Sequence, residues 1–152
     1  DKEIIVDDII LIDGVILTPL RQIRHPLGDV YHGMKKSDAG YSGFQEAYFS
    51  TINSGEIKSW KKHLQMTLNI VVPVGKIRFV LHDDRADSPT RGNFVDLTLS
   101  IDNYSRLTIP PGIWLAFRGE GEPINLLLNI SNLEHDPREM VRKDINTISY
   151  KW

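Results

Sequence analysis

Residues 94–102 read Phe-Val-Asp-Leu-Thr-Leu-Ser-Ile-Asp, and this stretch decides the class of fold. Apolar side chains occupy every second position from Val95 to Ile101, and mostly polar groups stand between them. Because successive side chains of a β-strand point to opposite faces, a period of two predicts a strand with one face buried. The stretch therefore predicts a half-buried strand.

Strands of similar character are expected along most of the chain. They are predicted at residues 16–23, 44–52, 56–63, 67–74, 76–83, 106–109, 113–118 and 124–131. Turn residues separate them, and Gly75 marks a tight hairpin because glycine tolerates positive φ. One helical turn is predicted after Asp136, with Pro137 at its first position, and an edge strand at residues 148–152. Many short strands at near-regular spacing predict an all-β sandwich or barrel.

The composition limits the kinds of partner. The 152 residues suit one domain over 1–152 with a sizeable core, and 18 basic against 20 acidic residues give a net charge of -2. No basic cluster is longer than Lys61-Lys62, so nucleic-acid binding is not expected. The longest apolar run, residues 70–74, is far below the roughly 18 residues of a membrane span. We therefore expect a small-molecule or protein partner and no membrane.

The expected compartment is the cytoplasm. The residues from Asp1 to Asp8 carry acids where a signal peptide would carry a basic end and a long apolar run. The sequence contains no cysteine, which fits a reducing compartment and a core that needs no disulfides.

Two short patterns outline a barrel frame. The first is Gly55 followed by Lys61-Lys62-His63 and then Gly75, and the second is Pro110-Pro111-Gly112-Ile113-Trp114-Leu115. Their spacing resembles the two motifs of the cupin barrel. In cupins these motifs supply three histidines and a glutamate that hold a metal ion.

The metal ligands of that frame are mostly replaced. Only His63 stands at a ligand position, because Lys61 and Leu115 occupy the places of two imidazoles and no carboxylate stands where the glutamate belongs. One neutral imidazole cannot hold a transition metal that requires three or four donors. We therefore predict no metal site and no other cofactor.

Three further stretches make the resemblance more specific. In chain order they are Asp83-Asp84-Arg85-Ala86-Asp87-Ser88-Pro89-Thr90-Arg91-Gly92, Leu99-Ser100-Ile101-Asp102-Asn103 and Leu107-Thr108-Ile109-Pro110-Pro111-Gly112. Over residues 44–118 the chain resembles the dTDP-4-dehydrorhamnose 3,5-epimerase family. The resemblance implies a metal-free, homodimeric cupin jelly roll. It also implies a nucleotide-linked 4-keto deoxysugar as the substrate, in the synthesis of bacterial surface polysaccharides.

The family's reaction moves a proton from one face of the sugar to the other. It requires a base, an acid and a cation that stabilises the enolate. By the resemblance, Lys61 replaces the base histidine, while Leu127 and Leu115 replace the acid tyrosine and a second histidine. Asp144 matches the aspartate that orients the base. Because strand alternation places His63 on the same face as Lys61, either can act as base, and His63, Lys61 and Asp144 are the catalytic candidates.

The residues expected to bind the substrate are Lys58, Ser59, Glu46, Tyr48, Arg85 and Trp114. Lys58 matches a phosphate-binding arginine and keeps its charge, but it loses the bidentate fork. Glu46 and Tyr48 stand where the family has glutamine and asparagine. For Arg85 a structural ion pair explains the residue as well as substrate contact does. Trp114 is more typical of a core or a dimer interface than of a contact with a nucleotide base.

Three functions remain open at this level. The first is a sugar-nucleotide epimerase or isomerase with altered catalytic residues. The second is a non-catalytic cupin that binds a sugar or sugar nucleotide or partners an active enzyme. Independently of the function, the simplest interpretation places Lys61 and His63 at a wet barrel mouth and Asp144 in a solvated charge cluster. The third is a structural dimer module whose barrel is filled by Leu68, Ile70, Phe79, Leu115 and Phe117. An open cavity that contains Lys61 and His63 would argue against the third.

Overall fold

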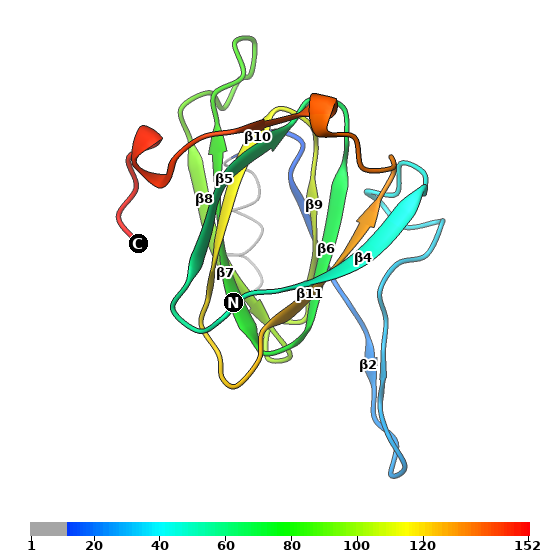
Figure 1. Cartoon of the computed structure of the whole chain (residues 1–152). Helices are drawn as coiled ribbons and strands as arrows, with labels where there is room; N and C mark the ends of the chain where they lie inside the picture. The colour runs from blue at the N-terminus through cyan, green and yellow to red at the C-terminus, as the bar shows by residue number, and fades with distance from the viewer. Residues whose placement is uncertain (1–11) are drawn as a thin grey trace.

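The computed structural model describes residues 12–152, which form a barrel of short strands (Figure 1). The expectation about Asp1 to Asp8 lies outside these residues. The strands are β1 (Ile16–Pro19), β2 (Gln22–Ile23), β3 (Val30–Tyr31), β4 (Glu46–Thr51), β5 (Ile57–His63), β6 (Leu68–Val74), β7 (Lys76–Asp83), β8 (Phe94–Ser100), β9 (Ser105–Ile109), β10 (Ile113–Gly119), β11 (Leu126–Ser131) and β12 (Met140–Arg142). Two 3-10 turns complete the described part, η1 (Pro137–Glu139) and η2 (Ile145–Thr147), and no helix in it is long and apolar enough to cross a bilayer.

Two five-stranded sheets face each other across the core. The strand orders are β1-β9-β6-β11-β4 in the first sheet and β12-β5-β10-β7-β8 in the second, with antiparallel pairing between neighbours. Ile70 and Leu107 from the first sheet and Phe79 and Leu81 from the second are at most 2% exposed in the space between them. The all-β architecture predicted from the alternating pattern is confirmed.

Strand β8 shows how that pattern produces burial. Val95 and Leu99 are each 1% exposed, and Leu97 packs against the same core, whereas Asp96 lies on the outer face. There the Asp96 carboxylate accepts hydrogen bonds from Arg78 on β7. The alternation therefore places apolar groups inward and a charge pair outward on the same strand.

The predicted strand at 16–23 is two strands. β1 pairs with β9 in the first sheet, but β2 pairs with β3 in a hairpin that projects from the barrel (Figure 1). The chain leaves the sheet between the two strands, and there the Leu20 N–H bonds to the Tyr104 carbonyl. The periodicity of residues 16–23 does not show that β1 and β2 pair with different strands.

The predicted edge strand at residues 148–152 is wrong. The edge of the second sheet is β12, which pairs with β5, and residues 148–152 form no strand. Instead Tyr150 and Trp152 pack on the outer face of that sheet, where the Trp60 and Trp152 rings lie 6.4 Å apart. Burial of large aromatic rings, rather than backbone pairing, holds this segment. The helical turn is present as η1, capped by the Asp136 carboxylate, which accepts a hydrogen bond from the Arg138 N–H.

The hairpin between β6 and β7 depends on Gly75, as predicted. Its φ is +81°, and an added Cβ would lie 2.3 Å from the Ile124 carbonyl oxygen. We expect Gly75→Ala to lower the free energy of unfolding by about 2 kcal/mol more than Gly55→Ala, measured by urea denaturation. Gly55 is the matched control because its φ is +82° while no atom of residues 12–152 lies within 4 Å of its added Cβ. Equal losses in the two variants would contradict the steric account.

Candidate functional site

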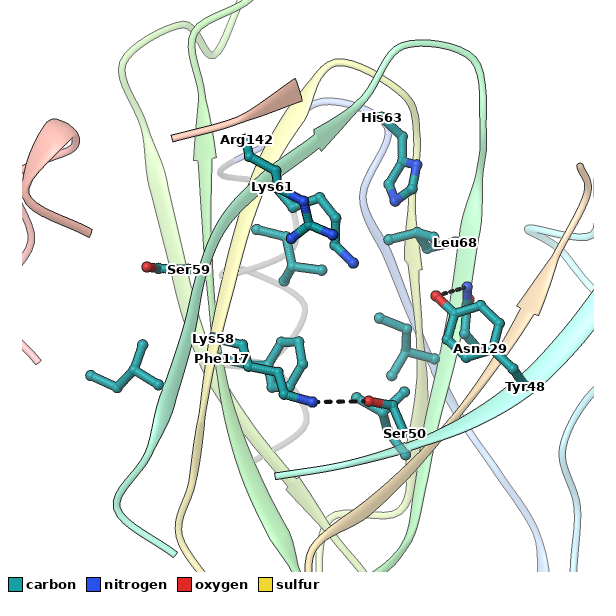
Figure 2. A pocket seen from close by; sticks show the side chains of 14 residues that line it. Tyr48, Ser50, Lys58, Ser59, Lys61, His63, Leu68, Phe117, Asn129 and Arg142 are labelled. Carbon is teal, nitrogen blue, oxygen red and sulfur yellow. Dashed lines mark hydrogen bonds between the residues drawn. The ribbon is translucent and has the colours of Figure 1, made fainter. Parts of the chain in front are cut away.

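A cavity of about 500 Å³ opens between the two sheets (Figure 2). Its lining residues come from β4, β5, β6, β10, β11 and β12, and they are Tyr48, Ser50, Ile57, Lys58, Ser59, Lys61, His63, Leu68, Ile70, Leu115, Phe117, Leu127, Asn129 and Arg142. The volume falls within the range of small-molecule sites. Because Leu68, Ile70, Leu115 and Phe117 line an open space, the filled barrel of the third hypothesis is not supported.

An irregularity in the pairing of β5 brings two lysines into this cavity. Leu115 pairs with Lys61, but Phe117 pairs with Lys58, so β5 has one extra residue between these pairs. Simple alternation would place Lys58 and Lys61 on opposite faces, whereas the bulge lets both line the cavity. Bulges of this kind commonly redirect a side chain beside an active site. The buried Trp60 packs on the outer face of the sheet.

His63 forms a buried pair with Glu139, a residue that the sequence did not single out. His63 Nδ1 contacts Glu139 Oε1, and Glu139 Oε2 accepts hydrogen bonds from the backbone N–H groups of Gln65 (3.2 Å) and Met66 (3.1 Å). His63 is 7% exposed and Glu139 is 9% exposed. His63 Nε2 has no hydrogen-bond partner within residues 12–152, and the ring lines the cavity.

The electrostatics of the pair favour a neutral imidazole beside a carboxylate. Burial lowers the pKa of His63 below its usual 6.5, and this outweighs the hydrogen bond and charge of Glu139, which raise it. Burial raises the pKa of Glu139, but the hydrogen bonds from His63 and the two backbone N–H groups outweigh burial and lower it. A neutral ring that donates from Nδ1 keeps a free lone pair on Nε2. In this arrangement Nε2 is the acceptor atom of the ring.

Three cations surround the rest of the cavity. Arg142 on β12 lies directly opposite Lys61 on β5, and neither side chain forms an ion pair in the described part of the chain. Burial lowers the pKa of Lys61, and the charges of Arg142 and Lys58 lower it further. Lys58 Nζ donates to the Thr51 carbonyl at 2.7 Å and to Ser50 Oγ at 3.3 Å. Because like charges opposite each other repel, this arrangement suits an anionic ligand.

The structure brings together five of the residues proposed from the sequence. Lys58, Ser59, Lys61, His63 and Tyr48 all line the cavity. Among the described residues, no three His, Cys, Asp or Glu side chains form a group that could hold a metal ion.

Two other candidates, Glu46 and Asp144, lie outside the cavity. Glu46 Oε1 accepts a hydrogen bond from the His135 N–H at 2.7 Å and so fastens the segment before η1. Asp144 is exposed at the start of η2 and caps no backbone group with its side chain. The carboxylate that contacts His63 comes from Glu139, five positions earlier in the chain.

Arg85 and Trp114 also lie elsewhere. Arg85 forms an ion pair with the buried Asp83, with Nε 2.9 Å from Oδ1. This is the structural ion pair that the sequence offered as one explanation of Arg85. Trp114 packs on the outer face of the second sheet, and its Nε1 donates to Asp84 at 2.8 Å. Four polar residues of the site were not predicted from the sequence, namely Glu139, Arg142, Asn129 and Ser50.

A barrel of two facing sheets, with a histidine–carboxylate pair and cations around its cavity, defines a cupin suited to a small anionic ligand. The chain is 37% identical to a dTDP sugar isomerase of Desulfovibrio desulfuricans, whose crystal structure matches with a TM-score of 0.89 over 93% of this chain and 92% of that one. It is 30% identical to a probable low-salt glycan biosynthesis epimerase of Haloferax volcanii, over 70% of this chain and 71% of the relative. It is 26% identical to the spore coat polysaccharide biosynthesis protein SpsL of Bacillus subtilis, over 93% and 97%.

No protein-family model matches the chain. The relatives nevertheless show that it belongs to the family of dTDP-4-dehydrorhamnose 3,5-epimerase-like sugar-nucleotide epimerases and isomerases. The family resemblance and the cupin jelly roll predicted from the sequence are thereby confirmed.

The His63–Glu139 pair predicts a specific titration. In ¹⁵N NMR spectra the His63 pKa should lie below 6.5, with the neutral ring protonated on Nδ1. Glu139→Gln should lower this pKa further, because it removes a negative charge that stabilises the imidazolium. Glu134→Gln, in the exposed segment before η1, is the control and should leave the titration unchanged. A rise in the His63 pKa in Glu139→Gln would contradict the assigned electrostatics.

Proposed function

We propose that this chain is a sugar-nucleotide epimerase or isomerase acting on a nucleotide-linked 4-keto deoxysugar in the synthesis of a surface polysaccharide. The observation that carries the proposal is the state of His63. Its ring lines the cavity, Glu139 holds Nδ1, and Nε2 has no hydrogen-bond partner among residues 12–152. The names of the relatives, which include an isomerase of dTDP sugars and an epimerase of glycan biosynthesis, support the substrate class.

The proposed chemistry begins at the carbon next to the keto group. His63 Nε2 takes a proton from that carbon, so a C–H bond breaks, an N–H bond forms and the electron pair moves onto the keto oxygen. Glu139 stabilises the resulting imidazolium by accepting from Nδ1. Return of a proton to carbon restores a ketone, either at the same position with a new configuration or at its neighbour.

Lys61 is placed to stabilise the enolate. It lies two positions from His63 on β5, and both side chains line the same wall of the cavity. Its ammonium group has no carboxylate partner in residues 12–152, and the apolar side chains around it strengthen any interaction with developing negative charge. Arg142 and Lys58 then supply the charge that holds the nucleotide diphosphate.

The alternative of a non-catalytic binding protein is less well supported. A cavity that only bound a ligand would not require an imidazole with its tautomer fixed by a buried carboxylate. Such pairs are typical of general bases.

The homodimer and the cytoplasmic location remain proposals. Large apolar side chains are exposed on the barrel and its projecting hairpin, including Phe49 at 66%, Phe44 at 58% and Val30 at 53%. Surfaces of this kind are typical of contacts between subunits, which supports a dimer.

Proton exchange in D2O tests the activity. With 4-keto sugar nucleotides carrying dTDP or UDP, we expect deuterium uptake at C3 or C5, detected by NMR. His63→Gln should reduce the rate at least about 100-fold, and Lys61→Met should reduce it by a smaller factor. His25→Gln, in the exposed turn between β2 and β3, is the control and should exchange like the wild type. Saturable binding with no exchange on any of these substrates would favour the non-catalytic alternative.

Binding of dTDP tests the role of Arg142. Isothermal titration should show binding that weakens as salt is added, because cations hold the diphosphate. Arg142→Gln should weaken it about tenfold, which corresponds to the loss of one charge-assisted hydrogen bond. Arg138→Gln is a control four positions away, since Arg138 is 90% exposed and pairs with Asp136 outside the cavity. Equal effects of the two substitutions would argue against a specific contact.

A further inference from the structure

Tyr48 lines the cavity from the sheet opposite to that of His63. It belongs to β4 of the first sheet, directly opposite Asn129 on β11, whereas His63 belongs to β5 of the second sheet (Figure 2). Tyr48, Asn129 and His63 all line the cavity. A bound sugar would therefore have the imidazole on one side and the phenol on the other.

The hydrogen bonds of Asn129 determine the direction of the phenol proton. Asn129 Oδ1 accepts a hydrogen bond from the backbone N–H of Asn69 at 3.1 Å, so its Nδ2 must be the atom that faces Tyr48. That Nδ2 group donates to the Tyr48 hydroxyl oxygen at 3.2 Å. The hydroxyl accepts here, and within residues 12–152 it has no other hydrogen-bond partner. Its own proton is consequently free to be donated to a molecule in the cavity.

This arrangement is rigid. Asn129 is 1% exposed and Asn69 is 3% exposed. The Asn69 side chain is itself fixed, because Oδ1 accepts from Thr108 Oγ1 at 2.6 Å and Nδ2 donates to the Gly40 carbonyl at 3.1 Å. The amide of Asn129 thus cannot turn over without leaving a buried backbone N–H unpaired.

We propose that Tyr48 is the general acid that returns the proton on the face opposite His63, so that the chain inverts a stereocentre. This inference rests on the proposed function, namely proton abstraction by His63. In the step, the Tyr48 O–H bond breaks, a C–H bond forms and the enolate becomes a ketone. Asn129 Nδ2 stabilises the phenolate by donation, and the phenolate regains a proton from solvent, since Tyr48 is 36% exposed. The His63 imidazolium returns its proton to solvent.

Other side chains are less suited to this step. Lys61 lies on the same strand and wall as His63, so it would return the proton on the side from which it was taken. Leu127, at the position of the family's acid tyrosine, lines the cavity but carries no proton to donate.

The experiment measures exchange and inversion separately in D2O. The wild type should produce the epimer with deuterium at the inverted carbon. Tyr48→Phe should still exchange that hydrogen within a few-fold of the wild-type rate, with retained configuration, while epimer formation falls at least about 100-fold. Asn129→Asp should behave like Tyr48→Phe, because a carboxylate accepts the phenol proton and turns it away from the cavity. Tyr150→Phe, on the outer face of the second sheet, should match the wild type.

The outcomes separate this inference from the function on which it rests. Absence of exchange in the wild type would overturn both. Exchange without inversion in the wild type would keep the base and overturn the role of Tyr48. Wild-type inversion in a folded Tyr48→Phe variant would also overturn that role, and the Tyr48→Phe result decides the matter if Asn129→Asp does not fold.

Discussion

The burial of the Glu139 carboxylate is the constraint on which the site depends. Removing a charged group from water costs free energy, and hydrogen bonds must offset that cost. Here the donors are His63 and the backbone N–H groups of Gln65 and Met66. All three donors belong to β5 or to the turn that follows it. The contact therefore holds η1 and β12 against β5, fixes which imidazole nitrogen carries the proton, and places Arg142 opposite Lys61. One electrostatic requirement sets both the local fold and the protonation state of His63.

The polar side chains of the cavity come from both sheets, and the two sheets supply different groups. The second sheet supplies the imidazole and the lysines, and the first supplies a phenol held by a chain of amides. Apolar side chains such as Leu68, Ile70 and Leu127 separate these polar groups and reduce the screening of charge by water. A reaction that takes a proton from one face of a planar enolate and returns it to the other requires opposed walls of this kind.

The sequence predicted the parts of the structure that local rules control. Alternation in residues 94–102 gave the buried face of β8, and the hairpin glycine followed from the need for positive φ. The bulge in β5 was not predictable, because an extra residue is defined only against the partner strand β10. Glu139 was not predicted as a site residue because it lies 76 positions from His63 in the chain. The capping pattern at Asp136 predicts a helical turn, but it does not show which distant residue the turn contacts. The aromatic side chains of residues 150 and 152 are typical of a strand in the sequence. In the structure their position depends on tertiary packing against the outer face of the second sheet.

The order of segments in the chain has a consequence for synthesis. Every strand of the first sheet, and every strand of the second except β12, precedes η1. Since a chain is made from its amino end, the ribosome completes these strands before it adds the carboxylate partner of His63 and the third cation of the cavity. A nascent chain that has not yet reached residue 139 lacks the carboxylate that contacts His63. The cavity of the enzyme we propose would therefore be completed only when β12 pairs with β5.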